Sequence, residues 1–141
     1  MLATSIESLE LIPMWNDADP EMRTRFQFAL HGGFGTESTA VVYFEVEPGE
    51  YLGRHTDSAE EILLVLEGEG IASVGDDDVE IGSGSLAVVP ALAPHSVRAT
   101  GNRTLKVVGF FSGAELEHVF DEPIQPIGAS RVTTPPVAVP A

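Results

Sequence analysis

Short β-prone runs separated by turn residues constrain the fold of this chain more than any other feature. The runs cover residues 40–46, 62–66, 71–74, 86–89, 95–99 and 105–111. Turn-forming pairs such as Pro48-Gly49, Gly75-Asp76 and Gly101-Asn102 lie between them. Many short strands at near-regular spacing, with few helical windows, predict an all-β sandwich or barrel.

The segment 62–66 is a continuous apolar run, which predicts a strand buried on both faces. One short C-terminal helix is expected after Ser112, because Leu116, Val119 and Phe120 fall at helical spacing on one face. His118 would then face solvent from that helix.

The length of 141 residues is sufficient for one domain. We expect a single domain over residues 1–127, with its core at 40–111. Residues 128–141 contain Pro135, Pro136 and Pro140 and predict an extended tail that is either disordered or lies across a partner.

The charge balance excludes some partners. Seven basic and 22 acidic residues give a formal net charge of −15, which disfavours nucleic acid and anionic membranes. The absence of cysteine excludes disulfides and thiolate metal ligands, and it suits a reducing compartment. With no signal-peptide pattern and no apolar run of membrane-spanning length, we expect a cytoplasmic protein.

Four residues of metal-ligand type have related spacings. His55 and Asp57 are two apart, so an extended strand would place both on one face. Glu61 has the same parity, and His95 opens a later run. Two imidazoles and two carboxylates converging inside a small barrel would bind Mn²⁺, Fe²⁺, Ni²⁺ or Zn²⁺.

Two alternatives stay open for this set. Asp57 could turn outward and pair with Arg54 or Arg98, which would leave two imidazoles and Glu61 as a facial triad. A slip of one residue in the strand assignment would exchange Glu61 for Glu60.

The spacing of these residues resembles the first motif of the cupin superfamily. The pattern is Gly49, five residues, His55, one residue, Asp57, three residues, Glu61, six residues and Gly68. Asp57 stands where the family usually has a second histidine. The resemblance implies that His55, Asp57, Glu61 and His95 are metal ligands.

A second stretch resembles the second cupin motif, with Gly84, five residues, Pro90 and then His95. Leu92 stands where a glycine is usual, and Ala99 where an asparagine is usual. Together the motifs cover about residues 40–111 and resemble a small single-domain cupin of the conserved-barrel type. The resemblance implies a jelly-roll β-barrel, commonly a homodimer, with metal in its mouth.

The aspartate at position 57 has a chemical consequence. Two carboxylates would bring the charge of a divalent site near zero, whereas three imidazoles and one carboxylate would leave it near +1. Such a site is a weaker Lewis acid and favours harder ions, so Fe²⁺ or Mn²⁺ is expected before Ni²⁺ or Zn²⁺.

Two further residues are candidates for the substrate pocket. Tyr43 lies on a strand whose family counterpart lines the cavity, although core packing explains it equally well. His31 precedes Gly32-Gly33-Phe34-Gly35, which predicts either a lid over the barrel mouth or an ordinary surface loop.

The function favoured by these residues is that of a metal-dependent enzyme acting on a small organic substrate. An oxygenase or dioxygenase reaction is preferred, because open metal positions would hold substrate and O₂ together. A redox-neutral isomerase, lyase or cyclase is the first alternative. A non-catalytic small-ligand-binding cupin is the second. The apolar N-terminal segment and the proline-rich tail favour a homodimer.

Overall fold

Strands account for most of the computed structural model, which describes residues 2–134 and 137–139. The strands are β1 (Ile12–Asn16), β2 (Asp19–Leu30), β3 (Ala40–Val46), β4 (Tyr51–Asp57), β5 (Glu61–Glu67), β6 (Glu69–Val74), β7 (Asp77–Gly82), β8 (Leu86–Val89), β9 (His95–Thr100), β10 (Leu105–Phe111), β11 (Glu117–Ile124), β12 (Ala129–Thr133) and β13 (Val137–Ala138). Two short 3₁₀ helices, η1 (Ile6–Ser8) and η2 (Gly32–Phe34), complete the described elements.

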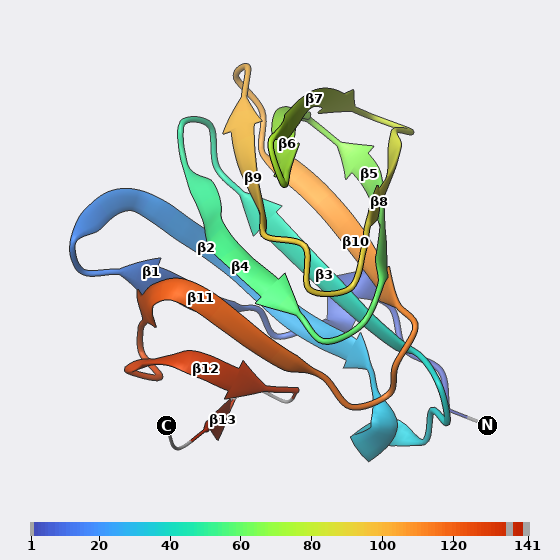
Figure 1. Ribbon diagram of the computed structural model, residues 1–141. Coiled ribbons are helices and arrows are strands. Elements are labelled where there is room, and N and C mark those ends of the chain that lie inside the picture. Colours follow the sequence, from blue (N-terminus) through green and yellow to red (C-terminus); the bar gives the residue numbers. More distant parts are fainter. Residues whose placement is uncertain (1, 135–136, 140–141) are drawn as a thin grey trace.

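Two antiparallel walls curve into a nearly closed barrel (Figure 1). One wall has the order β1-β2-β3-β10-β5-β8, and the other has the order β7-β6-β9-β4-β11-β12-β13. They are joined where β2 runs parallel to β4 at Met22 and Tyr51. This arrangement confirms the predicted jelly-roll barrel.

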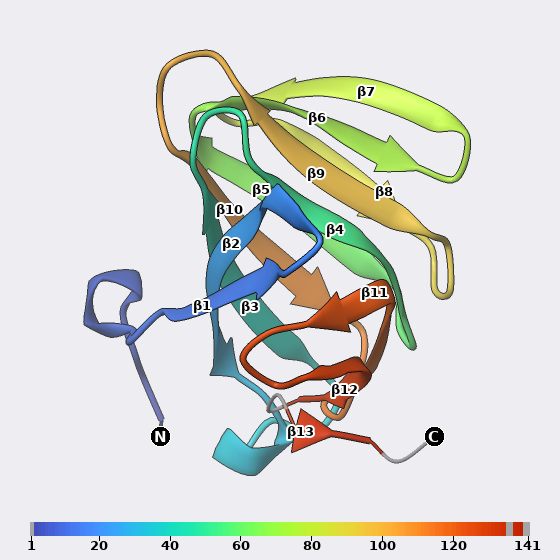
Figure 2. The same ribbon diagram turned by 90° about the vertical axis from the view of Figure 1, so that its left-hand side faces the viewer.

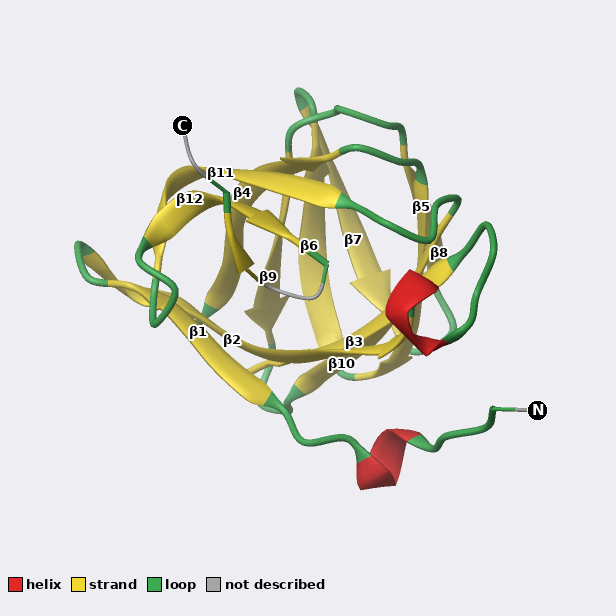
Figure 3. Ribbon diagram, turned by 90° about the horizontal axis from the view of Figure 1, so that it is seen from below, coloured by secondary structure: helices red, strands yellow, loops and turns green. Residues whose placement is uncertain are grey.

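The ends of the barrel differ. The hairpin of β6 and β7 lies at one end, and β11 to β13 lie toward the other (Figure 2). Viewed from that second end, the strands form a ring, and the N-terminal segment with η1 lies outside it (Figure 3). No helix in the part of the chain that the structure describes is long and apolar enough to cross a membrane.

Strand β5 is buried on one face only, which differs from the expectation for this segment. Leu63 and Val65 point inward and are buried, but Ile62 and Leu66 on the outer face are 38% and 40% exposed. The prediction that both faces are buried was therefore wrong, because nothing in the described part of the chain forms a second layer over the outer face. Ile62 instead lies between Phe110 of β10 and Val88 of β8, which are also exposed.

The expected C-terminal helix is also wrong, since the segment forms β11. His118 and Phe120 alternate inward along this strand and are buried. The strand pairs with β4 on one side and β12 on the other. These ladders and the burial of alternate side chains outweigh a helical spacing that rests on few residues.

The described part of the predicted tail is extended and belongs to the wall. β12 pairs with β11, and β13 pairs with β12, so this segment lies on its own chain. Pro135, Pro136 and Pro140 lie outside the described residues. The boundary at residue 127 stays a prediction.

Leu92 has a left-handed backbone, with φ of 65°, at the position where the second motif usually has glycine. Its N–H donates to the carbonyl oxygen of Asp57 at 2.9 Å, which fixes the turn before β9 against the end of β4. The side chain is 67% exposed, so little packing compensates for the backbone strain.

Leu92→Gly is expected to raise the free energy of unfolding by up to about 1 kcal/mol, because relief of strain exceeds the added entropy of the unfolded chain. Urea denaturation measures the change. Leu92→Ala is the matched control and should give no such gain, because alanine keeps the strain. An equal gain from both variants would instead trace the effect to loss of the exposed apolar side chain.

Candidate metal centre

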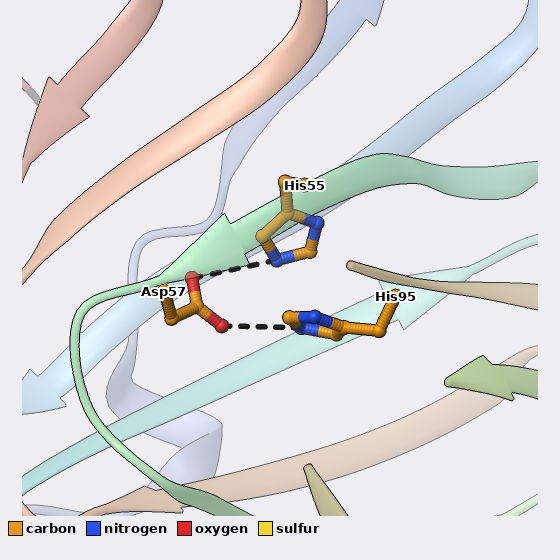
Figure 4. A group of neighbouring side chains, drawn as sticks. All are labelled: His55, Asp57 and His95. Carbon is orange, nitrogen blue, oxygen red and sulfur yellow. Dashed lines mark ion pairs between the residues drawn. The ribbon is translucent and has the colours of Figure 1, made fainter. Parts of the chain in front are cut away.

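His55, Asp57 and His95 converge in the barrel interior from two paired strands. His55 and Asp57 share the inward face of β4, and His95 pairs with His55 at the start of β9 (Figure 4). All three are buried, with exposed fractions of 6%, 2% and 2%. The two-residue period of β4 and its register with β9 therefore place the three side chains together.

The distances within this group suit a small ion. Nε2 of His95 lies 3.1 Å from Oδ2 of Asp57, and Nε2 of His55 lies 3.6 Å from Oδ1. One ligand atom from each residue falls within 4.8 Å of the others. The group of His55, Asp57 and His95 could thus bind a metal.

Glu61 opens β5 and lies at the edge of this group. Its Oε1 is 3.7 Å from Nε2 of His95, and the side chain is buried. It is close to His95, but the compact three-residue group does not include it. Glu60 is exposed, so the one-residue slip does not occur.

Asp57 points inward, which excludes its alternative pairing at the surface. Arg54 lies 3.7 Å from Asp121, and Arg98 lies 3.2 Å from Glu21. Both guanidinium groups therefore have other carboxylates outside the barrel.

Backbone carbonyl groups orient the two imidazoles. Nδ1 of His55 is 2.7 Å from the carbonyl oxygen of Gly53, and Nδ1 of His95 is 2.9 Å from that of Ala93. A carbonyl oxygen only accepts, so Nδ1 carries the hydrogen and a neutral ring directs the lone pair of Nε2 toward Asp57.

The fit to a metal is tested by two buried atoms that lack a partner. Within the described part of the chain, Nε2 of His95 and Oδ2 of Asp57 make no hydrogen bond although they are 3.1 Å apart. The lone pair of Nε2 in a neutral ring would face an anionic oxygen in a site shielded from water, which is costly. A divalent cation between them would satisfy both, so the residues fit such an ion.

Burial sets the charge states of this group. It lowers the pKa of His55 to about 4, so this ring is neutral at pH 7. Burial alone would raise the pKa of Asp57, but His55 and the hydrogen bond from His118 outweigh it and hold that pKa well below 3.8. Burial, and then the charge of Asp57, raises the pKa of Glu61 well above 4.5.

Glu61→Gln is expected to stabilise the metal-free protein relative to wild type at neutral pH. Because the pKa of Glu61 is raised on folding, the unfolded chain loses this proton first as the pH rises above 4.5. The relative stability of wild type should then fall by up to about 1.4 kcal/mol per pH unit until the raised pKa is reached. Urea denaturation of both proteins between pH 4 and 8 measures the difference.

The control for this prediction is Glu60→Gln, which makes the same change of side chain at an exposed neighbour and so reports the effect of the substitution outside the buried group. A difference between Glu61→Gln and wild type that does not change with pH would contradict the prediction.

His118 is the site residue that the sequence did not reveal. Its Nδ1 donates to Oδ1 of Asp57 at 2.6 Å, and its Nε2 accepts from Oγ1 of Thr134 at 2.7 Å. The expectation that His118 faces solvent was wrong, because β11 turns it into the barrel. The signal that would have found it is its two-residue spacing from Phe120, the inward period of a strand.

The two candidate pocket residues do not reach this site. Tyr43 is buried on the opposite face of β3, where its hydroxyl donates to Glu45 at 2.6 Å. His31 caps η2, accepts from the N–H of Gly33 and packs against the ring of Phe34 at a tilt. Neither is among the described residues that line the cavity.

The group opens onto a cavity whose empty space, together with the open solvent at its mouth, amounts to about 630 Å³. His55, Asp57, Glu61 and His95 form one part of its wall together with His118. Apolar side chains from both walls of the barrel form most of the rest. A molecule that entered this cavity would therefore lie beside the candidate metal ligands.

Comparison with known proteins gives the same class of fold. A family model described as the cupin domain matches residues 42–111. A cupin 2 domain-containing protein from Halorhodospira halophila has 23% identity and a TM-score of 0.58, and the alignment covers 63% of each chain, less than two-thirds of that protein. No curated protein sequence matches the chain significantly.

Two further solved structures are similar at lower identity. A predicted oxalate decarboxylase from Thermotoga maritima has 19% identity and a TM-score of 0.67 over 79% of this chain and 99% of that one. The polyketide cyclase RemF from Streptomyces resistomycificus has 19% identity and a TM-score of 0.63 over 79% and 78%. At these identities the likeness concerns the fold.

A nearly closed jelly-roll barrel with an interior His-Asp-His group defines a class of small barrel proteins that could bind a metal. With the family match over both motifs, the chain belongs to the cupin superfamily as a small cupin-domain protein.

Proposed function

We propose that this cupin is a metal-dependent enzyme that binds a small organic substrate in the cavity beside His55, Asp57 and His95, with Glu61 as the fourth ligand. The observation that carries the proposal is the buried contact of 3.1 Å between Nε2 of His95 and Oδ2 of Asp57 without a hydrogen bond. A metal is the partner that these atoms lack.

An oxygenase or dioxygenase reaction is the preferred chemistry. Four protein ligands leave open positions on a six-coordinate ion, and Fe²⁺ or Mn²⁺ suits the two carboxylates. When bound, such an ion supplies Lewis acidity and, if it is iron, reactivity toward O₂. The chain provides the side chains that bind the ion and shapes the cavity beside it. The apolar wall of the cavity limits the access of water.

A redox-neutral isomerase, lyase or cyclase is the second candidate. Two carboxylates make the ion a milder Lewis acid, which is sufficient to polarise a carbonyl group. The fold similarity to the polyketide cyclase RemF also favours this candidate.

One assay separates these candidates from simple ligand binding. The protein is loaded with Fe²⁺, Mn²⁺ or Zn²⁺ and incubated with a panel of catechols, naphthols and 1,3-diketones, while an electrode follows O₂ and chromatography follows substrate. O₂ consumption that occurs only with the Fe²⁺-loaded protein and substrate supports an oxygenase. Conversion of substrate without consumption of O₂ supports redox-neutral catalysis. Thermal stabilisation by panel compounds without conversion would overturn the enzyme proposal in favour of a binding protein.

The homodimer is also a proposal, and the outer face of β10, β5 and β8 supports it. Phe110, Ile62 and Val88 lie side by side there and are 44%, 38% and 54% exposed. A second copy of the chain that covers the same strip explains why a chain with a net charge of −15 exposes these apolar side chains.

Phe110→Arg is expected to convert this dimer to a monomer, because it places a charge at the β10 end of the strip, where the largest apolar side chain lies. Light scattering coupled to gel filtration measures the mass. The control is Val79→Arg, which changes an exposed valine of β7 outside the strip. A monomeric wild type, or dissociation by both variants alike, would contradict the proposal.

A further inference from the structure

The wall of the cavity is apolar and rich in aromatic rings. Five of the seven phenylalanines of the chain line it: Phe26, Phe28, Phe44, Phe111 and Phe120. Seven aliphatic residues, Met14, Val42, Leu52, Leu63, Val97, Ile124 and Val132, complete the apolar lining. Apart from the candidate ligands and His118, Thr24 is the one polar lining residue among those described.

The arginine and lysine side chains of the chain all lie outside this cavity. The chain has seven basic side chains, all within the described residues, and none of them lines the cavity. Those with acidic partners on the exterior are Arg25, Arg54, Arg98, Lys106 and Arg131. Arg23 lies over the ring of Trp15, and Arg103 lines a separate polar surface pocket.

The remaining charges of the site do not attract an anion. Asp57 and Glu61 are the acidic residues of the described lining, and in the metal-loaded form their two carboxylates leave the divalent ion no excess positive charge. A carboxylate or phosphate ester entering the cavity would lose its hydration and find no guanidinium or ammonium partner. A neutral apolar molecule loses little hydration and gains contact with the phenylalanine wall.

We infer that the cavity selects a neutral, largely apolar molecule that contains at least one ring, and that it rejects dicarboxylates and sugar phosphates. The further statement that the one polar group of the ligand faces His55 and His95 rests on the proposed function. The selection by charge rests on the lining alone, so it holds with or without a metal.

The test compares two probes that share a naphthalene ring. Binding of 2-naphthol, which is neutral at pH 7, and of 2-naphthoate, which is anionic, is measured by isothermal titration calorimetry on metal-loaded and chelator-treated protein. The naphthol is expected to bind at least about tenfold more tightly in both forms, because the carboxylate is desolvated without a partner. Equal or tighter binding of the naphthoate in either form would overturn the inference.

A second pair of variants tests the charge argument directly. Leu52→Arg places a cation on the half-buried part of the wall and is expected to reduce or reverse the preference for the naphthol, whereas Leu52→Met should preserve it. An unchanged preference in a folded Leu52→Arg protein would contradict the assignment of selectivity to the missing cation.

The location of binding is tested on β3. Val42→Phe fills the cavity and is expected to weaken the naphthol at least about fivefold, while Val41→Phe changes the opposite face and should not. An equal effect of both variants would place the probe outside the cavity and overturn the inference. Failure to bind metal with retained selectivity would overturn the proposed function alone.

Discussion

Replacing His95 with alanine is expected to remove bound metal from the purified protein. The variant loses the imidazole whose Nε2 lies closest to Asp57, at 3.1 Å, and leaves two carboxylates and one imidazole in a buried site. Loss of a direct ligand should exceed the roughly 10–100-fold loss of affinity that follows removal of an outer partner. Elemental mass spectrometry of wild type and variant, purified without added metal or chelator, measures the occupancy.

The matched control is His31→Ala, because His31 is also a buried histidine but lies outside the cavity. It should lower stability while preserving metal content. Retention of metal by folded His95→Ala protein, or equal loss from both variants, would contradict the proposed ligand set. His55→Ala should behave as His95→Ala does, since both rings are oriented through Nδ1 in the same way.

Replacing His118 with alanine is expected to lower metal affinity by roughly 10–100-fold without removing a ligand. His118 donates to Oδ1 of Asp57, and Thr134 in turn holds the His118 ring. Without this donor the carboxylate keeps its charge but loses its fixed orientation. Competition with a chromophoric chelator measures the dissociation constant, and thermal denaturation of metal-free protein reports the stability change separately.

His118→Asn is the conservative variant, because its amide nitrogen can donate from near the position of Nδ1, and it should restore part of the affinity. Thr134→Val removes the outer hydroxyl and should have a smaller effect in the same direction. If His118→Ala lowers the melting temperature but leaves the dissociation constant unchanged, the histidine only supports the barrel and does not position Asp57.

The sequence was sufficient to predict the barrel and the convergence of His55, Asp57 and His95, while Glu61 lies at the edge of that group. His55 and Asp57 share a face because the period of a strand is two, and Pro48-Gly49 marks the turn before β4. The register between β4 and β9 could not be derived, because it depends on pairing across the barrel.

Other features depend on contacts that local patterns do not contain. Glu45 marks one face of Val41 to Val46 as the wetter one, but both faces are otherwise apolar, so the pattern alone did not assign Val42 and Phe44 to the cavity and Tyr43 away from it. His118 fitted a short helix as well as a strand, and only its pairing with Asp57 across the sheet decided between them.

The contact from Asp57 through His118 to Thr134 joins segments that are far apart in the order of synthesis. His118 follows Asp57 by 61 residues, and Thr134 follows His118 by 16. A nascent chain therefore contains the candidate ligands well before it contains the groups that orient Asp57. Tight metal loading would then report that the final wall of the barrel has closed, which couples maturation of the site to completion of folding.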